Sequence, residues 1–205
     1  MLVIAAFAVT SAAAQFNPQQ PIPADKDVRT GKLENGMTYY IRHNEKPKGQ
    51  ADFYILHDVG AIQENDSQQG LAHFLEHKLF ENEDCDVFDL YAKTGANANA
   101  FTSFDKTCYF FSCSDNFKAS LEILLSFVQS PYFTPESVAK EQGIIGQEIR
   151  MCDDDPGWRV FFNMLCGLYQ KHPVRIDIAG TIESIAEITD DLLYRCYRTG
   201  YNLHN

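Results

Sequence analysis

The chain has 205 residues, of which 45% are hydrophobic and 22% charged, and its formal net charge is −11. This composition is typical of a globular chain with a sizeable core and excludes a disordered one. The acidic balance argues against nucleic-acid binding, since no basic surface neutralises phosphates, and it either favours cationic peptides or simply keeps the surface solvated.

The N-terminal segment has the features of a targeting sequence. Residues 1–14 are apolar and uncharged after Met1 and end in Ala12-Ala13-Ala14, which fits a small-residue cleavage site. The segment is too short to span a bilayer, so we expect a signal peptide, a periplasmic or secreted location and no stable membrane anchor. A positively charged start is missing, which leaves a buried N-terminal helix and a cytoplasmic location as alternatives. Residues 15–27, with their Pro/Gln-rich start, are predicted to form a linker.

Strand signals follow the linker. Residues 28–42 indicate two short strands joined at Asn35-Gly36, a dipeptide typical of hairpin turns. Residues 51–59 indicate a further strand. The polar loop after it offers Asp66 or Ser67 as the cap of the next helix.

That helix, over residues 70–80, carries the pattern His-x-x-Glu-His. Residues three and four apart are neighbours on a helix, so His73, Glu76 and His77 share one face. Two imidazoles one turn apart can hold Zn²⁺, and the glutamate can take a proton from a water molecule that the ion activates. The alternative is two solvent-facing histidines on an ordinary amphipathic helix. The spacing favours the metal motif, which is the inverzincin arrangement.

Helix and strand signals alternate in the remaining sequence. Paired strands are expected over residues 97–101 and 107–112, after a short helix that starts at residue 87. Further helices are expected to start at caps or at an aromatic residue, namely Asp115, Thr134 (running to Arg150 or beyond), Trp158, Thr181 and Thr189. The pattern predicts an α+β fold with a mainly antiparallel sheet covered by helices on one side.

A catalytic zinc ion needs a third protein ligand and an open position. Spacing alone does not choose among the many carboxylates. Glu148 is a candidate because its apolar neighbours would bury its helix, and Glu141 lies two turns earlier on the same face, where it could support the site. For each glutamate the alternative is an ordinary surface charge.

These motifs resemble the pitrilysin family of zinc peptidases, M16, which includes insulysin and the mitochondrial processing peptidase. The resemblance covers residues 29–205 and rests on residues 70–80, 99–102 and 141–148. It implies a mitochondrial processing peptidase-like metallohydrolase half-domain over residues 28–205. The interval between the histidines and the distal glutamate is shorter than is usual in the family.

The resemblance also implies roles for individual residues. In the family one zinc ion is held by two histidines and a glutamate, a second glutamate is the general base, and a third supports the site. The matching residues are His73, His77 and Glu148 for the metal, Glu76 for the base and Glu141 for the support. Asn99 and Ala100 match an edge strand that pairs with the substrate backbone.

The expected function is therefore zinc-dependent endopeptidase action on peptides or small unfolded proteins. Family members join the active domain to a related second domain or subunit, and this chain is expected to be incomplete at its C-terminus and weakly active or inactive alone. A non-catalytic partner or structural domain of the same family is the rival, which the intact motif argues against. A non-peptidase zinc hydrolase is a further alternative, which the substrate-strand resemblance disfavours.

Overall fold

The structure is a computed structural model that describes residue 21 and residues 23–203, so the predicted signal peptide and most of the start of the predicted linker lie outside the described residues. The strands are β1 (Val28–Lys32), β2 (Thr38–Arg42), β3 (Ala51–His57), β4 (Asn97–Thr102) and β5 (Thr107–Cys113). The helices are α1 (Leu71–Leu79), α2 (Val87–Thr94), α3 (Phe117–Phe127), α4 (Pro135–Asp154), α5 (Pro156–Leu168), α6 (Ile182–Ala186) and α7 (Asp190–Gly200), with short 3-10 helices η1 (Ala61–Gln63) and η2 (Pro173–Arg175). In the described part of the chain, no helix is long and apolar enough to cross a bilayer.

All strand pairs in the described residues are antiparallel, and they form two sheets rather than one. β1 and β2 form the predicted hairpin, in which Gly36 has a φ of 97°, a left-handed conformation that glycine adopts without steric cost. β3, β5 and β4 form the second sheet in that order, so β4 is an edge strand. The predicted α+β fold with mainly antiparallel strands is confirmed.

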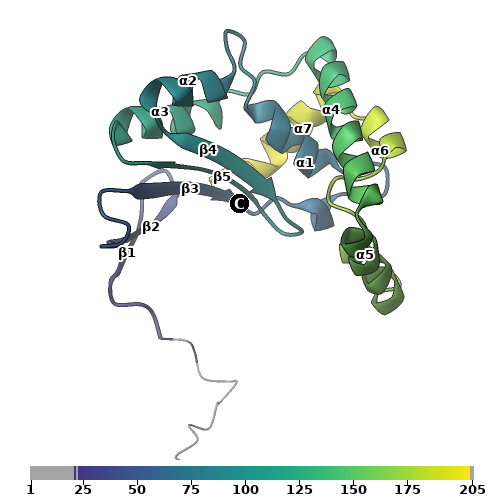
Figure 1. The fold of residues 1–205 in the computed structure, drawn as a ribbon, viewed down its shortest axis with the longest axis horizontal. Coiled ribbons are helices and arrows are strands. Elements are labelled where there is room, and N and C mark those ends of the chain that lie inside the picture. The colour runs from purple at the N-terminus through teal and green to yellow at the C-terminus, as the bar shows by residue number, and fades with distance from the viewer. Residues whose placement is uncertain (1–20, 22, 204–205) are drawn as a thin grey trace, which may run out of the picture.

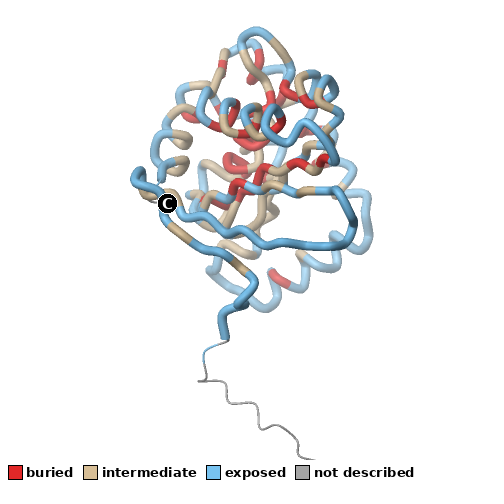
Figure 2. The backbone as a smooth tube through the Cα atoms, turned by 90° about the vertical axis from the view of Figure 1, so that its left-hand side faces the viewer, coloured by how far each residue is buried: buried red, intermediate tan, exposed pale blue. Residues whose placement is uncertain are grey.

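Helices cover one face of the three-stranded sheet (Figure 1). Tyr109 and Phe111 of β5 are fully buried in one apolar cluster with Phe74 and Leu75 of α1 and with side chains of neighbouring helices. Full burial of such a side chain stabilises the fold by about 1.5–3 kcal/mol. The opposite face is open, with Tyr54 of β3 62% exposed, and Figure 2 shows the buried segments concentrated between the sheet and the helices.

The start of α1 is held by Glu64, so the prediction that Asp66 or Ser67 caps this helix is wrong. The Glu64 carboxylate accepts hydrogen bonds from the backbone N–H groups of Gly70 and Ala72, at 2.8 and 2.7 Å. The loop of residues 64–69 folds back on itself. The side chain of Glu64, which is longer than that of Asp66 or Ser67, therefore reaches the N-terminus of α1. Burial raises the pKa of Glu64 to about 7 against the opposing effect of these backbone donors.

The other predicted caps have mixed outcomes. Thr134, Thr181 and Thr189 each accept a hydrogen bond from a backbone N–H in the first turn of α4, α6 and α7, as expected. Asp115 does not cap α3. The cap position is Asn116, which has a φ of 53°, and the Asp115 carboxylate instead accepts from the N–H of Asn116.

The loops before α1 and α6 pack backbone against backbone at two glycines. A Cβ added to Gly70 would lie 2.5 Å from the carbonyl oxygen of Ala179, and one added to Gly180 would lie 2.6 Å from that of Gln69. Both glycines also have left-handed backbone conformations. The C-terminal part of the chain therefore fixes where α1 begins.

This contact can be tested with Gly180→Ala. Gly95→Ala is a matched control, because Gly95 has a similar φ of +76° but nothing within 4 Å of an added Cβ. Both variants place an alanine in a left-handed backbone conformation, which lowers the free energy of unfolding by about 1–2 kcal/mol. Gly180→Ala must also separate two backbones, so we expect a further loss of roughly 1–3 kcal/mol. Thermal unfolding measures this, and equal melting temperatures for the two variants would contradict the proposed contact.

Candidate metal centre

Two helices bring the predicted site residues together. α1 buries Phe74, Leu75 and Leu79 in the core, which turns His73 and His77 toward α4. α4 starts at a firm cap, in which the Thr134 hydroxyl accepts from the N–H of Ser137 and Pro135 occupies the first helical position. The glutamates two and four turns further along α4 are Glu141 and Glu148.

Three side chains form a group that could hold a metal ion. One ligand atom each from His73, His77 and Glu148 lies within 4.8 Å of the others. Oε2 of Glu148 is 3.8 Å from Nε2 of His73 and 3.6 Å from Nε2 of His77. Ligand atoms around a tetrahedral zinc ion lie roughly 3.4 Å apart, given bonds of about 2.0–2.2 Å. The donor set of two imidazoles and one carboxylate therefore fits zinc in both chemistry and spacing.

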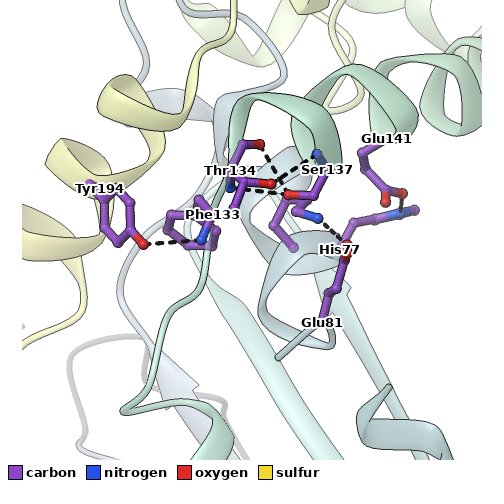
Figure 3. Close-up of polar contacts among 8 residues, drawn as sticks. His77, Glu81, Phe133, Thr134, Ser137, Glu141 and Tyr194 are labelled. Atoms are coloured by element: carbon purple, nitrogen blue, oxygen red, sulfur yellow. Dashed lines mark hydrogen bonds and ion pairs between the residues drawn. The ribbon is translucent and has the colours of Figure 1, made fainter. Parts of the chain in front are cut away.

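Glu141 orients His77 (Figure 3). Its Oε1 lies 3.0 Å from Nδ1 of His77, and the Glu141 residue is only 8% exposed. Because the carboxylate accepts the Nδ1 proton, Nε2 is left with a lone pair that faces His73 and Glu148. Burial lowers the pKa of His77, but the bond to Glu141 and the charges of the surrounding glutamates outweigh it and raise the pKa.

His73 has a different environment. Burial and the neighbouring His77 lower its pKa to about 4, so its imidazole is neutral near pH 7 and its Nε2 can serve as a metal ligand. Its Nδ1 is buried without a hydrogen-bond partner among the described residues. The two rings lie edge to face with their centroids 4.6 Å apart.

Glu76 lies beside this group without being part of it, and it is only 8% exposed. Its Oε2 accepts a hydrogen bond from the hydroxyl of Thr102, on strand β4, at 2.5 Å. Burial raises the pKa of Glu76, the Thr102 bond and His77 oppose that effect, and the charge of Glu148 adds to it. The sequence pattern indicates no role for Thr102. It lies in the 99–102 stretch on which the family resemblance rests, but its contact with Glu76 joins residues 26 positions apart, which local spacing does not predict.

A cavity of about 650 Å³ opens next to the site. Glu76, His77, Glu141, Glu148 and Asn99 line one part of it, and the acidic segment 81–86 lines another. That segment is closed by a bridge between its first and last residues. Its first residue also pairs with the fully buried Lys78 of α1, so the wall of the cavity is anchored in the core.

The structure places Asn99 and Ala100 on the edge strand β4, and Asn99 reaches the cavity. The N–H of Ala100 donates to Oδ1 of its neighbour Asn99 at 2.9 Å, so this N–H is directed away from β5. Ala100 does not belong to the cavity lining. An edge-strand N–H that is not bonded to a neighbouring strand is a group to which an extended peptide can add, here by replacing the Asn99 oxygen as acceptor.

Several proteins similar to this chain are named as zinc proteases or peptidases. The chain is 60% identical over 136 residues to the zinc protease YmfH of Bacillus subtilis, a match that covers 66% of this chain and 32% of that protein. The solved structure of an M16-like peptidase from Alicyclobacillus acidocaldarius superposes with a TM-score of 0.82 at 39% identity. That alignment covers 91% of this chain and 45% of the other.

A third relative is the periplasmic protease PqqL of Escherichia coli. Its structure matches with a TM-score of 0.81 at 27% identity, over 89% of this chain and 21% of PqqL. The chain thus spans less than half the length of each of these three relatives.

The family model of insulinase, peptidase family M16, matches residues 39–182. This range contains both helices of the candidate metal centre and the edge strand β4. The resemblance inferred from the motifs is confirmed. This chain belongs to the insulinase family of peptidases, family M16.

Proposed function

We propose that this chain carries the catalytic centre of a zinc endopeptidase, with His73, His77 and Glu148 as the metal ligands. The observation that carries the proposal is the position of three lone-pair donors around one point, with Glu76 adjacent but outside the group. The naming of relatives as zinc proteases supports the choice of metal.

The chemistry divides between the metal and the protein. When bound, zinc supplies the Lewis acidity that polarises a peptide carbonyl and makes a water molecule more acidic. Glu76 takes a proton from the attacking water on its carboxylate and then delivers it to the leaving amine. Its raised pKa supports this role, because a more basic carboxylate holds the proton better. Glu141 keeps His77 in the tautomer with a free Nε2.

Asn99 and Ala100 are proposed to bind substrate through the open edge of β4. Main-chain pairing ignores side chains, so it suits a peptidase that cleaves varied sequences. Selectivity would come from the adjoining cavity, whose lining has carboxylates on the 81–86 segment and one lysine, Lys140. Such a lining favours positively charged residues near the cleaved bond.

The rival function is a non-catalytic partner or structural domain of the same family. The presence of the complete set of ligands and of Glu76 supports the catalytic assignment, because an assisting domain needs none of them. A second M16-like half, as a domain or a subunit, is proposed to complete the cleft, since the relatives extend well beyond the matched region. The domain that we assign to residues 28–205 stays a prediction.

Zinc binding can be measured on the purified chain. We expect one zinc ion per chain in the wild type, and loss of this zinc in His77→Ala. His43→Ala is the matched control, because His43 is an exposed histidine outside the ligand group and should leave the zinc content unchanged. Glu141→Gln should weaken zinc binding by roughly 10–100-fold, since it removes an outer partner of a ligand. Equal zinc in the wild type and in His77→Ala would refute the assignment.

Peptide cleavage tests Glu76. Glu76→Gln keeps the size of the side chain but cannot take a proton, so we expect full zinc binding and a fall in kcat of roughly 10²–10⁴-fold. Glu45→Gln is the control, because Glu45 is exposed and does not line the cavity, and it should cleave at nearly the wild-type rate. The assay is run on the chain with and without the second half, and we expect much faster cleavage with it. Near-normal cleavage by Glu76→Gln would show that Glu76 is not the base.

We further propose that the chain is exported. The apolar start of the sequence and the similarity to periplasmic PqqL support this location. The mature protein is expected to begin at Gln15, and mass spectrometry of its N-terminal peptide checks this. An intact Met1 on protein recovered from the cytoplasm would contradict it.

A further inference from the structure

We propose that Thr102 is a positioning residue that fixes the orientation of the Glu76 carboxylate. Strand β4 would then link two parts of the site. Its open edge pairs with the peptide backbone, and its Thr102 holds Glu76, the group that moves the proton. The inference rests on the proposed function, because it assigns Glu76 the role of the base. Its evidence is a separate set of contacts, among Glu76, Thr102 and Thr107, that includes none of the proposed metal ligands.

The direction of the hydrogen bond follows from the neighbouring groups. The Thr102 hydroxyl lies 2.5 Å from Oε2 of Glu76 and 3.4 Å from the hydroxyl of Thr107. The Thr107 hydroxyl donates to the carbonyl oxygen of Val59 at 2.8 Å, and a carbonyl can only accept. The single proton of Thr107 is therefore used, and the proton of Thr102 goes to the Glu76 carboxylate, which is much the nearer acceptor and which, when ionised, can only accept.

The donor itself is held firmly. Thr102 has a β-branched side chain with a restricted χ1, and it projects from a strand that pairs with β5 along its whole length. Thr107, which lies opposite Thr102 in the register, is completely buried. A rigid donor on one carboxylate oxygen fixes the plane of the carboxylate and leaves the other oxygen to exchange the proton.

The same strand carries the groups proposed to bind the substrate. Ala100, two residues before Thr102, directs its N–H toward the open edge, while the side chains of Ala100 and Thr102 lie on the same, partly buried face. α1, which carries Glu76, packs against this strand. A peptide aligned on β4 would therefore have a fixed register relative to Glu76, because only one residue of the strand separates Ala100 from Thr102.

The test compares Thr102→Val with Thr102→Ser. Valine keeps the branched shape and removes the donor, whereas serine keeps the donor. For the protein with its second half, we expect Thr102→Val to lower kcat by roughly 10–100-fold while KM and zinc content change little. Thr102→Ser should recover most of the lost rate. A purely structural role would instead lower the melting temperature and zinc content of the valine variant together with its activity, and that result would overturn the inference.

A second measurement needs no cleavage. In chain labelled with ¹³C at the glutamate carboxyl carbons, the Glu76 signal is identified by its absence from Glu76→Gln. We expect this signal to shift in Thr102→Val and to keep nearly its wild-type position in Thr102→Ser. An unchanged signal in Thr102→Val would overturn the inference.

The failures of the two proposals are distinguishable. Absence of cleavage by the zinc-loaded wild type would sink the proposed peptidase function. Equal kcat for the wild type and Thr102→Val would leave that function intact and sink the role of Thr102 alone.

Discussion

The packing of α1 between the sheet and α4 is the constraint on which the candidate site depends. Its apolar side chains are buried in the core that it forms with β4, β5 and α7, and the two histidines face Glu148 of α4. Glu64 holds the first turn, and the glycine contact with the loop before α6 fixes where that turn begins. A shift of α1 by one residue would rotate the histidines by about 100°, away from Glu148.

The two histidines differ although they are only one turn apart. Burial and the neighbouring His77 lower the pKa of His73 and keep its imidazole neutral. His77 is close to several carboxylates, which favour its proton but also determine which nitrogen carries it. Desolvation thus favours the neutral ring of His73, whereas for His77 the bond from Nδ1 to Glu141 leaves Nε2 as the nitrogen available to a metal ion. The Nε2 atoms of both rings face the same carboxylate oxygen.

Local patterns in the sequence predicted the local features of this structure. The helix of His73 and His77, the hairpin at Asn35-Gly36 and the threonine caps depend on residues a few positions apart, and the structure contains them. The contacts that were missed are less local. Glu64 reaches past two better capping residues because the loop folds back, and Thr102 meets Glu76 only once β4 lies beside α1. The separation of the β1–β2 hairpin from the other sheet likewise depends on tertiary packing.

The bond between the side chain of Asn99 and the N–H of Ala100 has a consequence for chemical selectivity. An open strand edge attracts any extended chain, including other copies of the same protein. Here the N–H of Ala100 already donates to the side chain of Asn99, so an incoming backbone carbonyl must replace the Asn99 oxygen as the acceptor. Brief, poorly aligned encounters gain little from that exchange, whereas a chain that forms several bonds along β4 gains more than it displaces. If β4 binds substrate as proposed, the Asn99 side chain therefore favours peptides that pair with several residues of the strand over those that touch it at one point.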